Sequence, residues 1–349
     1  MKLGSFCVLQ NGKSIPKTVV GNVPVYGSTG IIGFTNKSLV GEEGVLIARV
    51  GANCGMVQYL PNKPSWISDN TIICVPKKTV CLVKYLYYCL QKSNISKYRI
   101  GSAQPLLTIK ILSALDIDVP SLTNQQHIVG TIGSVDDLIE NIARKRNAIN
   151  LILSTSLYAK NEVVPLSAYH PNLVKPGIDY FQNFKTYLDT SCVETTDPID
   201  YGFQVSYDKR PSRANMQPSE NTVWTARMKS SFKVLGITHN DKIITEKCIL
   251  STGFLGVTES SHLCLPFIYS LFISKPFRIL KDLNSTGATM ESINNKDFLE
   301  IKVPLLSSAE MEDYRIKYSP LLLELSSLRE EEIRLNKVKE SLLAKYFNH

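Results

Sequence analysis

The sequence predicts a mixed α/β fold in which two globular domains are separated by two long antiparallel helices that resemble a coiled coil. Short strand-like segments punctuated by glycines alternate with helical segments. Apolar residues recur at helical spacing over two stretches that are longer than most globular helices need. The segments around these two stretches also repeat along the chain. We therefore expect a pseudo-twofold molecule.

The first globular domain is predicted to span residues 1–120. Strand-like segments occur at Val23–Tyr26, Val45–Ala48 and Thr71–Val75, and a tyrosine-rich helix is expected near residues 83–91. The glycines between residues 27 and 33 lack the spacing of a dinucleotide-binding loop. We interpret them as turns between strands.

The first long helix is predicted within residues 121–161, directly after a strand that ends at Pro120. Its apolar residues are separated by three, four and seven positions, which is the spacing of a helix packed against another long helix. At roughly 1.5 Å per residue, about 30 residues would span about 45 Å. The seam is predicted to contain Val135, Leu138, Ile142, Ile149 and Ile152.

The second half repeats this plan, with a globular domain at 162–304 and a long helix at 305–349. Leu299–Pro304 echoes Leu115–Pro120, and Ser341–Lys345 matches Ser156–Lys160. The two helices can satisfy one another's apolar faces. The second seam is predicted to contain Leu321, Leu325, Leu328, Leu335 and Leu342.

Composition narrows the functional classes. The formal charge of +8 is compatible with a polyanionic partner. The eight cysteines form no CxxC pair and the five histidines show no ligand spacing, so we expect neither a metal site nor a disulfide framework. No apolar run is long enough to span a bilayer, and we expect a cytoplasmic protein.

The order of these motifs resembles the specificity subunit of type I DNA restriction–modification systems. The repeated units at Leu115–Lys160 and Leu299–Lys345 carry the resemblance. Val23–Ser28 is similar to the opening of many target recognition domains, and Arg210–Met216 is similar to a motif of another recognition-domain subtype. Asn124 departs from the family by replacing the usual acidic residue at the start of the conserved helix.

The resemblance implies a non-catalytic subunit without a cofactor of its own. Each globular domain would be a target recognition domain that reads one half of a bipartite sequence in double-stranded DNA. The helices would set the spacing between the halves. Two methyltransferase subunits, expected to use S-adenosylmethionine, would dock on this scaffold, and restriction–translocase subunits would join the complex.

Sequence readout needs side chains that reach base edges, together with basic contacts to phosphate. Basic and amide residues on turn-rich segments are therefore the DNA-binding candidates. In the first domain these are Lys13, Arg49, Asn53, Asn70 and Gln104. In the second domain they are Lys209, Arg210, Arg213, Asn215, Gln217, Arg227 and Lys229.

Two other functional classes remain open at this point. The chain could be a coiled-coil scaffold with two protein-binding heads and no role with nucleic acid. It could also be a stand-alone modification enzyme, although it contains no Asn-Pro-Pro-Tyr or Asp-Pro-Pro-Tyr segment of the kind with which a DNA adenine methyltransferase holds its flipped base.

Overall fold

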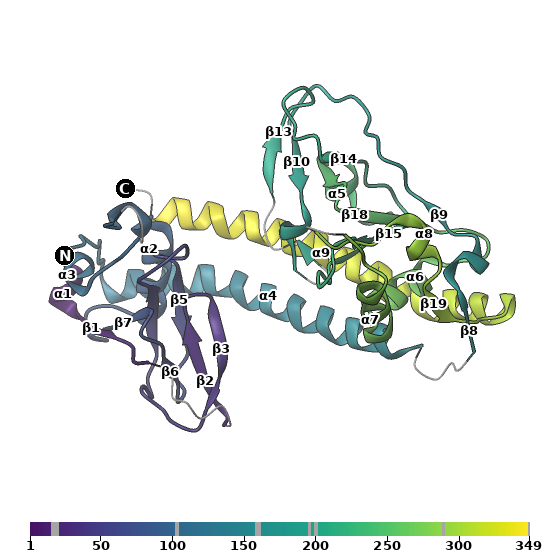
Figure 1. The fold of residues 1–349 in the computed structure, drawn as a ribbon. Coiled ribbons are helices and arrows are strands. Elements are labelled where there is room, and N and C mark those ends of the chain that lie inside the picture. The colour runs from purple at the N-terminus through teal and green to yellow at the C-terminus, as the bar shows by residue number, and fades with distance from the viewer. Residues whose placement is uncertain are drawn as a thin grey trace. The chain divides into compact units, whose positions relative to one another are not determined.

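A computed structural model describes residues 1–14, 21–101, 105–157, 162–194, 197–198, 202–287 and 290–347 (Figure 1). The fold is mixed α/β with two long helices, α4 (Leu122–Thr155) and α9 (Ser308–Phe347). The chain forms two compact units: unit 1 contains Met1–Leu138 and Asn336–His349, and unit 2 contains Ile139–Leu335. Because each unit includes part of both long helices, the domain boundaries expected from the sequence stay a prediction.

Unit 1 is built on a four-stranded antiparallel sheet whose strand order is β1-β7-β4-β5. A smaller sheet, β3-β2-β6, packs on one of its faces. The strands are β1 (Cys7–Asn11), β2 (Val23–Gly27), β3 (Gly30–Thr35), β4 (Gly44–Ala48), β5 (Val57–Leu60), β6 (Trp66–Ile67) and β7 (Thr71–Pro76). The helices are α1 (Leu3–Phe6), α2 (Val83–Lys92), η1 (Ile95–Tyr98) and α3 (Ile109–Ser113).

Both faces of the larger sheet in unit 1 are buried, which explains why β4 is apolar throughout. Val45 and Ile47 face a core that includes α2 and the two long helices, through residues such as Ile132 and Leu343. Leu46 points the opposite way, toward the smaller sheet, because side chains alternate across a strand. The sheet is thus held rigidly on the helices.

Unit 2 contains two four-stranded sheets with the orders β13-β10-β17-β14 and β16-β15-β18-β9, and the pairs β19-β8 and β11-β12. Its strands are β8 (Val163–Pro165), β9 (Asn172–Leu173), β10 (Lys185–Leu188), β11 (Val193–Glu194), β12 (Asp197–Pro198), β13 (Phe203–Val205), β14 (Ala214–Met216), β15 (Thr222–Ala226), β16 (Val234–Ile237), β17 (Cys248–Ser251), β18 (Phe254–Thr258) and β19 (Lys302–Pro304). Its helices are η2 (Leu166–Tyr169), η3 (Thr190–Cys192), α5 (Lys242–Lys247), α6 (Leu265–Ile273), α7 (Lys275–Leu283) and α8 (Asn295–Leu299).

The core of unit 2 gathers around α6, in which every residue is buried. A helix that is apolar on all sides belongs in the interior of a fold, and α6 accordingly packs among β15, β16 and both long helices. This interior helix explains the longest apolar run in the sequence.

The long helices run antiparallel within each unit. In unit 2, Tyr314 near the start of α9 shares a core with Leu153 near the end of α4. In unit 1, Ile128 and Ile132 near the start of α4 share a core with Leu343 near the end of α9. The beginning of one helix therefore packs beside the end of the other in both units.

The predicted seam of α4 was wrong at two positions. Leu138 and Ile152 are 47% and 49% exposed, whereas Leu153 is fully buried. One residue along an α-helix turns the side chain by about 100°, so Leu153 faces the core and its neighbour Ile152 does not. Between the buried Ile142 and the half-buried Ile149, the same face carries Arg146, which forms an ion pair with Glu332.

The remaining residues of the two predicted seams are buried or half-buried. The buried residues are Val135, Ile142, Leu325 and Leu328. The half-buried residues are Ile149, Leu321, Leu335 and Leu342. All eight cysteines are buried free thiols. Among the described residues, no group of metal-binding side chains occurs and no helix has the length and hydropathy of a membrane span.

Candidate nucleic-acid interface

Four of the candidates in unit 1 come together at one end of the larger sheet. β1 and β4 end there, and β7 and β5 begin there, as the pairs Asn11 with Ile72 and Ile47 with Val57 show. Lys13, Arg49, Asn53 and Asn70 lie in the connections at this end. The Arg49 amide donates to the Asn70 carbonyl at 2.9 Å, which ties two of the connections together. Residues that are remote in sequence thus share one surface, which we call the sheet end of unit 1.

The side chains at the sheet end of unit 1 differ in how freely they can reach a partner. Lys13, Asn53 and Asn70 are exposed. Arg49 is half-buried, and its Nε has no hydrogen-bond partner although it is enclosed. This unused Nε donor is suited to an acceptor that arrives from outside. Gln104 lies outside the described residues.

Two further basic residues, which the sequence reasoning missed, approach the same end. The loop from Gly51 to Gly55 lies against η1: a Cβ at Gly55 would come within 3.0 Å of the Ser96 backbone. This contact brings the exposed Lys97 and Arg99 beside the loop. The signal was present in the sequence as a basic–aromatic–basic run around Tyr98, a composition that suits nucleic-acid contact.

In unit 2, Arg213 lies at the end of the sheet formed by β13, β10, β17 and β14. Its carbonyl accepts a hydrogen bond from the Thr252 amide at 2.8 Å, directly after β17 ends. Its guanidinium lies close to Gly253, in the following turn. Arg213 and the neighbouring Lys209 are exposed, and Asn215 is half-buried. These three side chains are the ones that remain available to a partner.

Two candidates in unit 2, Arg210 and Gln217, serve the structure of their own loops. The Arg210 Nε donates to the Ala214 carbonyl at 3.1 Å, and its guanidinium lies 4.2 Å from the centre of the Tyr207 ring. Gln217 donates to the Pro218 and Thr245 carbonyls at 3.3 and 3.4 Å. Both side chains therefore shape the segment that presents Lys209 and Arg213.

Arg227 and Lys229 are also engaged within unit 2. Arg227 donates to the Phe254 and Ile293 carbonyls at 3.3 and 3.4 Å, and burial lowers the pKa of its guanidinium. Lys229 forms an ion pair with Glu291 at 2.8 Å. A role for either residue at DNA stays a prediction and would require these contacts to be exchanged.

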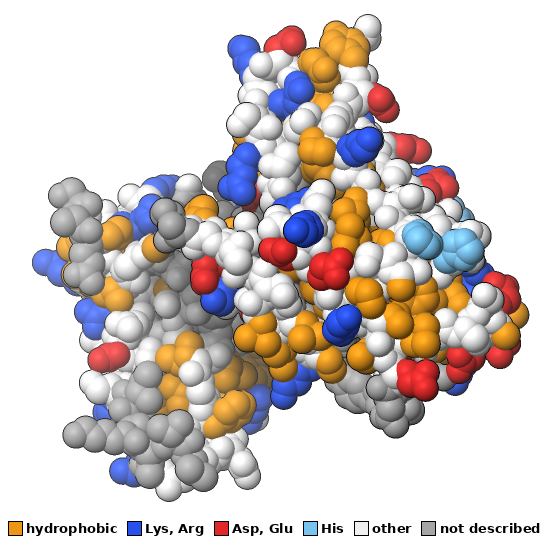
Figure 2. All heavy atoms as spheres, turned by 45° about the vertical axis from the view of Figure 1, so that its right-hand side comes forward, with side chains coloured by type: hydrophobic (Ala, Val, Ile, Leu, Met, Phe, Trp, Pro, Cys, Tyr) orange, Lys and Arg blue, Asp and Glu red, His pale blue; other side chains and the backbone are white. Residues whose placement is uncertain are grey.

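A projection formed around β10 and β13 adds an aromatic surface that sequence reasoning did not select. Tyr180 and Phe184 are each 69% exposed, and Tyr180 packs against Tyr207 with ring centres 5.0 Å apart. Lys185 lies 5.4 Å from the centre of the Phe181 ring. Figure 2 shows hydrophobic side chains together with basic ones on this projection.

A known protein family matches the first part of the chain. Residues 1–151 match the family model described as type I restriction modification DNA specificity domain. Over residues 1–151 the chain is therefore similar to the type I DNA specificity family. This match confirms the family resemblance stated from the sequence motifs.

Individual relatives agree with the family match. The chain is 28% identical over 137 residues to the Type I restriction enzyme EcoprrI specificity subunit of Escherichia coli, covering 37% of this chain and 34% of the relative. It is 25% identical over 191 residues to a putative type I specificity subunit of Mycoplasma pneumoniae, covering 52% and 56%. The aligned regions thus span about a third and about half of these relatives.

A solved structure shares the fold. The S subunit of a type I restriction–modification system from M. genitalium superposes with a TM-score of 0.59 and 18% sequence identity, and the superposition covers 99% of this chain and 94% of that chain. A specificity subunit is thus a fold relative of the chain over nearly its full length.

Proposed function

We propose that this chain is the DNA sequence-specificity subunit of a type I restriction–modification complex. In this proposal each unit's recognition sheet reads one half of a bipartite target in double-stranded DNA. The observation that carries the proposal is the family match of residues 1–151, whose candidates Lys13, Arg49, Asn53 and Asn70 converge on one sheet end. Exposed cations and amides on one surface are the groups that contact phosphates and base edges.

The two long helices would act as the spacer between the half-sites. Duplex sites that are read from one face lie about 34–36 Å apart, or a multiple of that distance. An antiparallel helix pair that is part of both recognition units is suited to fixing such a spacing. The pseudo-twofold repeat in the sequence would match the twofold character of the duplex.

The chain would act through partners and not by catalysis. Two methyltransferase subunits would dock on it and supply S-adenosylmethionine chemistry, and restriction–translocase subunits would join them in the cytoplasm.

Binding of the complex with its methyltransferase subunit to duplexes with one intact and one scrambled half-site tests the proposal. Replacing Lys209 and Arg213 with alanine should weaken binding to one half-site and leave the other unchanged. For a side chain that binds phosphate, the replacement should reduce the slope of log K against log salt by about 1, and for one that binds a base edge it should cost about 1–3 kcal/mol. Lys145→Ala, at an exposed site on α4, is the matched control.

The outcome also separates the alternative functions. Salt-independent binding, or binding without any preference for a split sequence, would favour a scaffold with two protein-binding heads. Methyl transfer by the purified chain alone would favour a stand-alone enzyme. Equal weakening at both half-sites in the double variant would mean that Lys209 and Arg213 do not read one half-site.

A further inference from the structure

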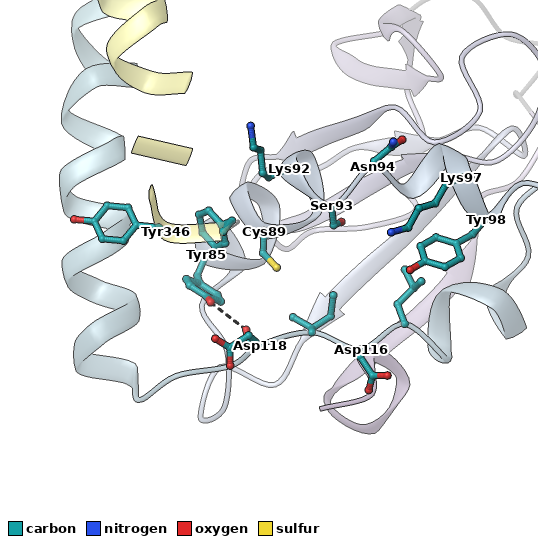
Figure 3. Close-up of a pocket in the computed structure, with 13 residues that line it drawn as sticks. Tyr85, Cys89, Lys92, Ser93, Asn94, Lys97, Tyr98, Asp116, Asp118 and Tyr346 are labelled. Carbon is teal, nitrogen blue, oxygen red and sulfur yellow. Dashed lines mark hydrogen bonds between the residues drawn. The ribbon is translucent and has the colours of Figure 1, made fainter. Parts of the chain in front are cut away.

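Each unit contains a groove beside the strand segment that precedes a long helix. In unit 1 a groove of about 590 Å³ lies between α2, residues 115–118 and the end of α9 (Figure 3). In unit 2 a groove of about 640 Å³ lies between α7, β19 and Leu157, just after α4. Neither groove includes a DNA-binding candidate that was predicted from the sequence, although Lys97 lines the unit 1 groove.

The two grooves occupy equivalent places in the internal repeat. The pair Cys81-Leu82 before α2 matches Cys264-Leu265 at the start of α6. In the same register Lys92 matches Lys275, and both lysines line their grooves. In the repeat of the pre-helical strand, Asp118 matches Lys302, which are again both lining residues. Equivalent parts of the two halves thus build equivalent grooves.

The groove of unit 2 combines an apolar surface with two unpaired cations. Ile279 and Val163, both on its lining, are 49% and 55% exposed. Lys275 and Lys302 are exposed at its rim, and neither forms an ion pair with any residue that the structure describes. Exposed apolar surface with a charged rim is typical of a protein interaction site. The charge favours an apolar segment that carries a carboxylate.

The groove of unit 1 is more polar, and one of its two lysines, Lys92, already has an acidic partner. Figure 3 shows Lys92 and Lys97 on the side of α2 and η1, and Asp116 and Asp118 on the strand segment across from them. The Lys92 Nζ lies 3.9 Å from the Glu340 Oε2 of α9. An acidic segment would meet two carboxylates here, with Lys97 and the shared Lys92 as the cations, so the same ligand should bind less tightly than in unit 2, where the two lysines face no carboxylate on the lining.

We propose that the two grooves are the docking sites for one and the same acidic, apolar segment, contributed by each of two copies of the methyltransferase subunit. The unit 2 groove takes the first copy and the unit 1 groove takes the second, more weakly. The proposal rests on the proposed function, because that function supplies two identical partners for a chain with two equivalent but unlike grooves.

Native mass spectrometry of the full chain with the methyltransferase subunit tests this inference. The unaltered chain should bind two copies in two separable steps. Ile279→Asp should abolish the tighter step and leave the weaker one. The matched control is Leu283→Asp, which alters the same helix at a residue that is 74% exposed and does not line the groove. It should bind both copies as the unaltered chain does.

Charge reversal provides a second variant that leaves the apolar packing intact. Lys275→Glu should weaken the tighter step about tenfold, because it replaces an attraction between opposite charges with a repulsion. Lys92→Glu, the equivalent change in unit 1, should weaken only the weaker step. Two copies bound with unchanged affinity to both Ile279→Asp and Lys275→Glu would overturn the groove assignment. No copy bound to the unaltered chain would instead overturn the proposed function, and the groove assignment with it.

Discussion

The two units attach their globular parts to the long helices with different chemistry. In unit 1 the fully buried Gln125 at the start of α4 donates to the Val80 and Pro120 carbonyls at 2.9 and 2.8 Å and accepts from the Leu82 amide at 2.8 Å. In unit 2 the buried Arg329 of α9 pairs with Asp241 at 2.5 Å and donates to the Gly236 carbonyl at 2.9 Å. A neutral amide in unit 1 and an ion pair in unit 2 thus both join a long helix to the rest of the unit.

The difference matters because the two solutions carry different penalties. A buried amide with every group bonded loses little on leaving water, whereas two buried charges lose much of their hydration and recover it mainly through their mutual attraction. The unit 2 attachment is therefore the more sensitive to loss of one partner. Neighbouring Glu330 reinforces it by accepting from the Ile243 amide at 2.6 Å.

The largest effect is expected from Arg329→Ala. It leaves Asp241, which is fully buried, without its countercharge, and should lower the free energy of unfolding of unit 2 by about 3–5 kcal/mol. Each unit contains one tryptophan, Trp66 in unit 1 and Trp224 in unit 2. Urea unfolding followed by the fluorescence of Trp224 in a Trp66→Phe background measures this change.

The control for Arg329 is Glu331→Ala on the same helix, where the side chain is exposed. It should change the free energy of unfolding by less than about 0.5 kcal/mol. Equal effects of the two replacements would show that the buried ion pair is not the attachment that distinguishes unit 2.

The second expected effect concerns the helix face on which the unit 2 core depends. Leu153→Ala removes a fully buried side chain and should cost about 2–5 kcal/mol. Ile152→Ala removes the half-exposed neighbour and should cost far less. Thermal unfolding of the two variants, which differ by one position, checks the register. A lower Tm for Ile152→Ala than for Leu153→Ala would show that Ile152 faces the core, as the sequence predicted.

Gln125→Ala should destabilise unit 1, and by less than Arg329→Ala or Leu153→Ala destabilises unit 2. It leaves the Leu82 amide and two carbonyls without partners, and an unmet buried group costs about 1–3 kcal/mol. Gln126→Ala, at the exposed next position, should be nearly neutral. Trp66 fluorescence in a Trp224→Phe background reports on the unit concerned. A destabilisation as large as that of Arg329→Ala would contradict the view that the ion pair is more sensitive than the amide to loss of one partner.

The sequence predicted the long helices well because their apolar period is independent of the rest of the fold. It could not choose between Ile152 and Leu153, which have nearly the same hydrophobicity. A charged residue within the seam, Arg146, also interrupts the apolar pattern, and its partner Glu332 is remote in sequence. The mixed α/β class followed from local glycine turns and strand runs.

The candidate site was more predictable in unit 1 than in unit 2 for a similar reason. Lys13, Asn53 and Asn70 lie in loops next to strands, so the turn chemistry places them at a sheet end. Whether Arg227 is exposed depends instead on carbonyls of Phe254 and Ile293, which come from other parts of the chain. A basic residue alone carries no information about such remote acceptors.

The smallest effect per group is expected from pH, and it again separates the units. Burial raises the pKa of Cys74, Cys81 and Cys89 in unit 1 to about 12, and that of Cys264 in unit 2 to about 11. The folded pKa values exceed the unfolded value near 9.0, so their contribution to stability is complete below pH 9 and is lost as the pH rises toward 11–12. Each thiol should cost about 1 kcal/mol between pH 8 and 9.5.

Unit 1 should therefore lose stability faster than unit 2 over this range, because it contains more of these buried thiols. Urea unfolding at pH 8 and 9.5, followed by Trp66 in one background and Trp224 in the other, compares the two slopes. Cys89→Ala should reduce the pH dependence of unit 1 by the share of one thiol and leave that of unit 2 unchanged. Identical slopes for the two units would show that thiol burial does not distinguish them, since unfolding exposes the same type of group in both.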